Sequence, residues 1–145
     1  MKEIYAEIEI DTSAACVWEI LMDFAAYPEW NPFIRETSGE TRVGSRLRVR
    51  FQPPGGRGMT FKPELLRFEP AREMRWLGKL FISGLFDGEH ALTIKQLEGD
   101  RVMFAQHEKF TGLLVPLLSG TLKGAAKGFE AMNYALKERA ELAGE

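Results

Sequence analysis

The sequence predicts an α+β fold, in which a curved seven-stranded antiparallel sheet wraps around one long C-terminal helix. Two observations support this prediction. Six strand-like segments follow one another between about residues 33 and 110, and the last 30 residues change to a helical period. The 145 residues are 45% hydrophobic and 28% charged, which is typical of one globular domain over residues 1–145.

The N-terminal segment has the alternation of a half-buried strand. Every second residue from Ile4 to Ile10 is apolar, and the residues between them are polar or aromatic. Ser13 then stands where it can cap a short first helix. A second short helical turn is expected within 27–33, because the two prolines of this segment limit its length.

The middle of the chain consists of strand patterns separated by turn signals. Pro53-Pro54-Gly55-Gly56-Arg57-Gly58 predicts a turn. Pro63 and the following Leu65-Leu66 pair predict an edge position or a bulge. After a first strand that begins near Phe33, the predicted strands cover about 46–51, 59–68, 73–79, 86–97 and 101–110.

The last two predicted strands form a hairpin, because only a short glycine-containing connection, 98–100, separates them. Pairing of Leu97 with Arg101 sets His90 opposite Glu108. Each of the two residues lies on the same face of its strand as apolar neighbours, because side chains alternate between the two faces. An imidazole and a carboxylate are therefore expected to face each other inside a largely apolar space.

Three interpretations of His90, Gln106 and Glu108 stay open. They can be buried polar groups that fix strand register, groups that orient the polar end of a ligand, or an acid/base pair. An unpaired buried polar group costs about 1–3 kcal/mol. The presence of several such residues in one neighbourhood therefore favours a polar spot within a cavity.

The C-terminal segment predicts one long amphipathic helix, since apolar residues recur at intervals of three and four from Leu118 to Leu136. Gly120, Gly124 and Gly128 form a row at the flank of this apolar stripe. The row is interpreted either as close packing on a neighbour or as space for a ligand.

Four connections are expected at one end of the sheet, because every second connection of an antiparallel meander lies at the same end. They are 27–33, 53–58, 80–85 and 111–117, and they carry unusually many apolar side chains. Such a set is interpreted as a cavity mouth, a partner surface or a membrane contact, or as a plug that folds inward.

Several classes of function are disfavoured. The formal net charge of −2 argues against nucleic-acid binding. Cys16 cannot form an intramolecular disulfide, and no Cys/His cluster has zinc spacing, so neither a metal nor a cofactor is expected. The N-terminus lacks the apolar run of a signal peptide, and no stretch of about 18 apolar residues occurs. We therefore expect a cytoplasmic monomer or weak homodimer without a transmembrane segment.

Three stretches are typical of one known superfamily: Tyr27-Pro28-Glu29-Trp30-Asn31-Pro32-Phe33, Gly88-Glu89-His90 and the run from His107 to Leu117. Over essentially its whole length the sequence resembles the START-like, or SRPBCC, superfamily, in its polyketide cyclase/dehydrase and lipid-transport-like branch. It implies a helix-grip, Bet v 1-like fold with a hydrophobic cavity between sheet and helix, entered among the four connections. It assigns no role to His90 or Glu108.

We therefore expect binding, transport or sequestration of a small hydrophobic molecule, such as a lipid, a quinone or a polyketide-like aromatic. Alternatives are a cyclase/dehydratase-type enzyme, with His90 and Glu108 as candidate catalytic residues, and a protein- or membrane-interaction module. The expected ligand-binding residues are Trp30, Phe51, Phe61, Trp76, His90, Leu92, Phe104, Gln106, Glu108, Phe110, Phe129 and Met132.

Overall fold

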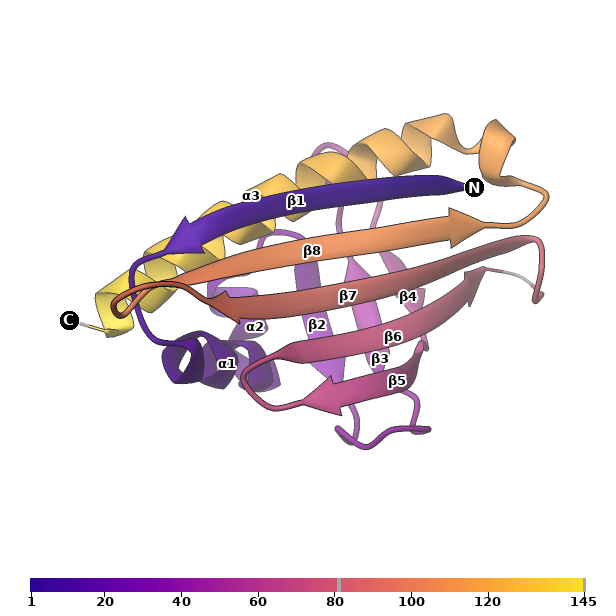
Figure 1. Ribbon diagram of the computed structural model, residues 1–145. Coiled ribbons are helices and arrows are strands. Elements are labelled where there is room, and N and C mark those ends of the chain that lie inside the picture. Colours follow the sequence, from indigo (N-terminus) through magenta and orange to yellow (C-terminus); the bar gives the residue numbers. More distant parts are fainter. Residues whose placement is uncertain (81, 145) are drawn as a thin grey trace.

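Two antiparallel sheets form the fold in the computed structural model, which describes residues 1–80 and 82–144. The larger sheet consists, in spatial order, of β1 (Lys2–Ile10), β8 (Val102–Thr111), β7 (Phe86–Gln96), β6 (Glu73–Leu80) and β5 (Glu64–Glu69). The smaller sheet consists of β2 (Ile34–Ser38), β3 (Arg48–Phe51) and β4 (Met59–Phe61). The strands of the smaller sheet run behind the larger sheet and across its strand direction (Figure 1).

The expectation of one seven-stranded sheet is wrong, because the segment predicted as a single strand over 59–68 is divided between the two sheets. β4 ends just before Pro63, which has no backbone N–H to continue a ladder. Backbone hydrogen bonds from Leu47 N to Pro63 O and from Leu65 N to Ser45 O, both 2.9 Å, connect the sheets at this corner. A register shift between Leu65 and Arg67 confirms the predicted bulge.

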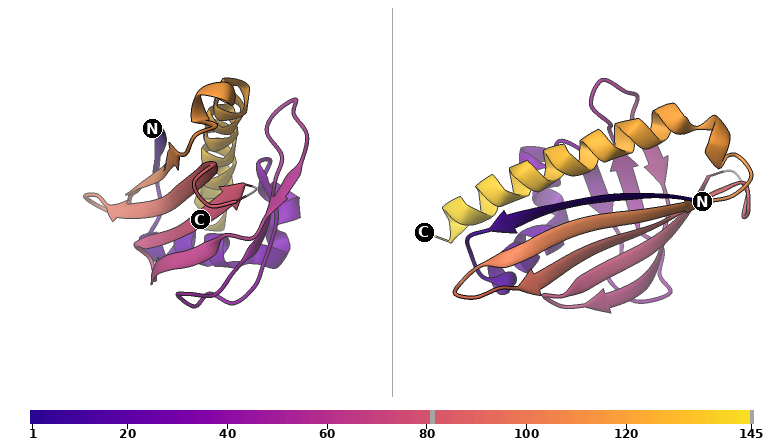
Figure 2. Two further views of the ribbon diagram at one scale, coloured as in Figure 1. Left: turned by 90° about the vertical axis from the view of Figure 1, so that its right-hand side faces the viewer. Right: turned by 45° about the horizontal axis from the view of Figure 1, so that its top comes forward.

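The long helix α3 (Ser119–Ala143) lies along the space between the two sheets, as the end-on view shows (Figure 2). Its buried residues include Phe129, Met132 and Leu136, which confirms the predicted apolar stripe in its second half. The predicted long C-terminal helix and the α+β class are therefore confirmed.

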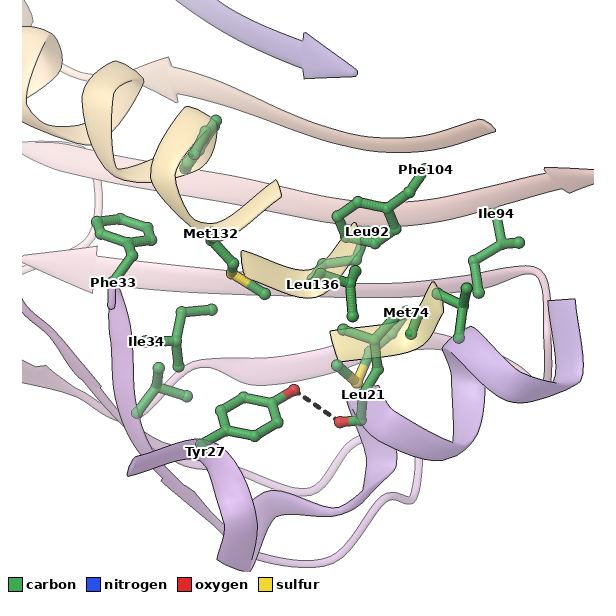
Figure 3. Packing of buried hydrophobic residues seen from close by; sticks show 14 of the residues in the cluster. Leu21, Tyr27, Phe33, Ile34, Met74, Leu92, Ile94, Phe104, Met132 and Leu136 are labelled. Atoms are coloured by element: carbon green, nitrogen blue, oxygen red, sulfur yellow. Dashed lines mark hydrogen bonds between the residues drawn. The ribbon is translucent and has the colours of Figure 1, made fainter. Parts of the chain in front are cut away.

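Short helices follow β1. Ser13 caps α1 (Ala14–Met22), since its Oγ accepts a 3.1 Å hydrogen bond from Cys16 N, as predicted. A 3-10 turn (Phe24–Ala26) and α2 (Tyr27–Trp30) come next. The hydroxyl of Tyr27 donates to the backbone O of Leu21 at 2.6 Å and so ties α2 to α1 beneath the core (Figure 3).

The β7–β8 hairpin has the predicted register. His90 pairs with Glu108 and Ile94 with Phe104, and Leu97 N donates to Arg101 O at 2.9 Å. The hairpin contributes Leu92, Ile94 and Phe104 to a core that also contains residues of α1, α2, β2, β6 and α3 (Figure 3).

Two of the four connections that were expected at one end lie side by side. Leu113 N and Leu114 N donate to the backbone of Gly84 and Leu85, and the 3-10 turn Val115–Leu117 leads on into α3. The side chains of Ile82, Leu113 and Leu117 are 67–80% exposed, so they do not plug the core. Pro53, at the start of the turn 53–58, contacts α3 at Gly124. Phe81 lies outside the described residues.

Candidate functional site

A cavity opens between the two sheets and the first half of α3. The cavity has a volume of about 90 Å³ and is open to solvent at its mouth. An apolar hollow with few polar groups is the usual form of a small-molecule site. It is lined by Phe33, Phe51, Pro53, Met59, Phe61, Pro63, Trp76, Gly78, Phe86, Gly88, Glu108, Phe110, Thr121 and Ala125.

Five of the expected ligand-binding residues line this cavity. Phe51 and Phe61 come from the smaller sheet, with their ring centroids 5.6 Å apart. Trp76, Glu108 and Phe110 come from β6 and β8 of the larger sheet. Because the two sheets face each other here, residues that are distant in sequence form opposite walls.

The other expected residues lie outside the cavity wall. Trp30 packs on Tyr27 in α2, with ring centroids 5.3 Å apart. His90 and Gln106 are fully buried beside the wall. The remaining four belong to the main hydrophobic core: Leu92, Phe104, Phe129 and Met132.

The sequence interpretation missed several lining residues, above all the glycines of the cavity floor. Gly78 and Gly88 pair directly across β6 and β7, and both line the cavity. Glycine is depleted in strand interiors, where it often marks a close approach. Two glycines at strand positions were therefore a signal, but recognising it required the β6–β7 register.

A chain of buried polar side chains runs from the cavity wall to α3. Nε2 of His90 lies 3.0 Å from Oε1 of Gln106. Nε2 of Gln106 donates to Oδ1 of Asn133 at 2.8 Å and is 3.4 Å from the backbone O of Phe129. Asn133 was not predicted, although an asparagine one turn after Phe129 on the apolar stripe was the available signal.

Glu108 stands at the cavity end of this chain. Its Oε1 lies 3.5 Å from Nδ1 of His90, and its side chain is 15% exposed whereas that of His90 is fully buried. Burial raises the pKa of Glu108 to about 8. Burial also lowers the pKa of His90 to about 4, against a smaller raising effect of the hydrogen bond to Gln106.

Gly88 provides the space that the carboxyl group of Glu108 occupies. A Cβ atom at position 88 would overlap Oε2 of Glu108. The carboxyl group therefore lies over the backbone of β7, at the floor of the cavity.

Aromatic rings surround His90. Its imidazole centroid is 4.9 Å from that of Phe129, 5.1 Å from that of Trp76 and 6.4 Å from that of Phe51. Trp76 and Phe51 also line the cavity. The imidazole is thus held rigidly one layer behind the surface that a ligand would touch.

The glycine row of α3 serves close packing at two of its three positions. A Cβ at Gly128 would overlap the ring of Phe33, and one at Gly124 would lie 3.2 Å from Cβ of Pro53. No atom lies within 4 Å of a Cβ built at Gly120. Phe33 and Pro53 both line the cavity, so this packing helps to set where its wall stands.

No helix in the described ranges 1–80 and 82–144 is long and apolar enough to cross a membrane. The same residues contain no group of three or more His, Cys, Asp or Glu side chains that could hold a metal ion.

The fold and this apolar cavity define a helix-grip protein of the START-like class. Residues 1–141 match the family described as polyketide cyclase/dehydrase and lipid transport, and the chain belongs to that family. No curated protein matches the sequence significantly.

Solved structures share the fold at low sequence identity. A START superfamily protein from Mycobacterium smegmatis is 23% identical, with a TM-score of 0.75 over 97% of this chain and 98% of that one. The Zhui aromatase/cyclase from Streptomyces sp. R1128 is 15% identical, with a TM-score of 0.77 over 97% and 93%. A hypothetical protein from Helicobacter pylori is 17% identical, with a TM-score of 0.75 over 96% and 88%.

Proposed function

We propose that this protein binds a small, largely hydrophobic molecule in the cavity between its two sheets and α3. The observation that carries this proposal is a hollow whose walls are apolar except for one carboxyl group, that of Glu108, and the hydroxyl group of Thr121 at the start of α3. Apolar walls supply affinity, and a placed polar group supplies orientation. Phe51, Phe61 and Trp76 would contact the body of the ligand and Glu108 its polar end.

The first test is denaturing extraction of the freshly purified protein followed by mass spectrometry, against a mock purification. A hydrophobic molecule present in stoichiometric amount supports the proposal and identifies a ligand class. An empty protein that also fails to bind a panel of hydrophobic probes would contradict it.

Filling the cavity provides the second test. Ala125→Phe introduces a ring at a position that lines the cavity. Ala126→Phe introduces the same ring at the next position of α3, which does not line the cavity. We expect the first variant to lose the extracted molecule and the second to retain it. Equal retention by both folded variants would argue against this cavity as the site.

An acid/base enzyme is the second candidate, favoured by the 3.5 Å approach of His90 Nδ1 to Glu108 Oε1. Such an enzyme would move a proton at the carbon beside a ketone. Deuterium exchange into 2-tetralone in D₂O, followed by mass spectrometry, tests this directly. If the protein is such an enzyme, it should exchange deuterium faster than the protein-free control, and His90→Ala should remove this excess. Exchange by the unmodified protein at the rate of the control would exclude catalysis on this ketone.

A further inference from the structure

The orientation of the buried Gln106 amide follows from its two partners on α3. Its Nε2 lies 2.8 Å from Oδ1 of Asn133 and 3.4 Å from the backbone O of Phe129. A peptide carbonyl only accepts hydrogen bonds, so the atom that faces it is the amide nitrogen. Oε1 of Gln106 therefore points in the other direction, to His90.

This orientation decides which ring nitrogen of His90 carries hydrogen. An amide oxygen only accepts, so Nε2 of His90 is the donor to Oε1 of Gln106 at 3.0 Å. In the neutral ring, Nδ1 is then left with its lone pair. Nδ1 is buried without a hydrogen-bond partner in the described part of the chain, and it lies 3.5 Å from Oε1 of Glu108.

One proton must lie between Nδ1 of His90 and Oε1 of Glu108, because two facing lone pairs in a buried site repel each other. On Oε1, this proton makes a carboxylic acid beside an imidazole. On Nδ1, it makes a carboxylate beside an imidazolium. The pair has no net charge in either form, and in both forms Oε2 of Glu108 has no proton. The pKa of Glu108, raised to about 8 by burial, agrees with a proton retained by the pair at neutral pH.

Oε1 of Glu108 faces His90, and Oε2 is the other carboxyl oxygen, which lies so close to Gly88 that a Cβ atom built there would overlap it. Both Glu108 and Gly88 line the cavity. The polar point that Glu108 presents to a ligand is therefore a hydrogen-bond acceptor without net charge. A ketone or a carboxylate brings only acceptors to this point, whereas a hydroxyl group brings a donor.

We propose that the cavity, if it has the binding function proposed above, selects a neutral hydrophobic molecule with a hydroxyl group, such as an alcohol or a phenol, which donates a hydrogen bond to Oε2 of Glu108. The aromatic and proline side chains of the wall enclose the remainder of the molecule. A carboxylate group is disfavoured at this point, because its negative oxygen atoms would face a buried acceptor.

Isothermal titration calorimetry at pH 7 with four probes that share one ring system tests this selectivity. The probes are 2-naphthol, 2-methoxynaphthalene, naphthalene and 2-naphthoate. We expect 2-naphthol to bind about tenfold more tightly than its methyl ether, since it makes one additional hydrogen bond, and 2-naphthoate to bind most weakly. Glu108→Leu should abolish the preference for naphthol and keep affinity for the ether. The control Glu138→Leu, at an exposed position of α3, should keep the preference.

The outcomes separate the two proposals. Equal affinity for naphthol and its ether, or tightest binding of naphthoate, would overturn the selectivity and leave the binding function standing. Failure of all four probes to bind would overturn both. Where Glu108→Leu does not fold, long-range ¹⁵N–¹H NMR of His90 in the unmodified protein provides the test. We expect Nε2 of His90 to carry a hydrogen. An unprotonated Nε2 would overturn the proposed hydrogen-bond arrangement and with it the selectivity.

Discussion

The ring of Phe33 lies directly against the backbone of α3 at Gly128, where a Cβ atom would overlap it. Phe33 is held on its other sides by Phe51 and Phe129, at centroid distances of 5.2 and 5.7 Å. The ring therefore has little room to move. This contact brings the smaller sheet and the long helix together at the inner edge of the cavity.

Gly128→Ala should lower the free energy of unfolding by about 1–2 kcal/mol, because overpacking against Phe33 outweighs the better helix propensity of alanine. Gly120→Ala is the matched control on the same helix, where a Cβ meets no atom within 4 Å. It should raise the free energy of unfolding by up to about 1 kcal/mol. Urea unfolding of both variants checks the pair, and equal effects would contradict the packing argument.

Gly88→Ala should displace the carboxyl group of Glu108 without unfolding the protein, because the overlapping atom is the end of a flexible side chain. The NMR signals of the His90 imidazole should shift as Oε1 leaves Nδ1. Gly78→Ala is the control on the paired strand, where the nearest atoms lie 3.9 Å from a built Cβ. It should leave those signals in place, and unchanged signals in both variants would refute the close approach of Gly88 and Glu108.

Stability should fall by about 1 kcal/mol between pH 7 and pH 8 through Glu108. Its pKa is raised to about 8 from 4.5, so over this range the folded state retains a proton that the unfolded state has already lost. The stabilisation is therefore present at lower pH and is lost as the pH rises. His90, whose pKa is lowered to about 4 from 6.5, acts mainly below this window.

Urea unfolding at pH 7 and pH 8 measures this dependence. Glu108→Gln should abolish the slope, whereas Glu138→Gln should preserve it. A slope that persists in Glu108→Gln would assign the titration to another group.

Ala71→Gly should stabilise the protein by about 0.5–1 kcal/mol, because Ala71 has a φ of +63°, in the left-handed region that favours glycine. The residue lies in the turn between β5 and β6, where Arg72 N donates to Glu69 O at 3.0 Å. Thermal unfolding by calorimetry measures the gain. A lower melting temperature would contradict this prediction. It would show that the entropy that glycine adds to the unfolded chain destabilises the protein by more than the relief of backbone strain stabilises it.

Local sequence signals were sufficient where the structure depends on local geometry. The short connection 98–100 sets the β7–β8 register, and the alternation of side chains along each strand then places His90 opposite Glu108. The cap at Ser13 and the spacing along α3 follow from the same kind of short-range rule.

Parity along a strand shows that a side chain faces inward, but not what lies opposite. Phe104 and Phe110 share a face of β8, yet Phe104 lies in the core and Phe110 in the cavity wall.

The α+β class, the long amphipathic helix and the meeting of His90 with Glu108 could be predicted from the sequence, because each depends on residues that are near in the chain or on one hairpin. Three features became visible only in the folded chain: the division of the sheet at Pro63, the position of the cavity, and the hydrogen bond between Gln106 and Asn133. These features depend on how distant elements pack. The raised pKa of Glu108 belongs with them, since it arises from burial by several elements at once.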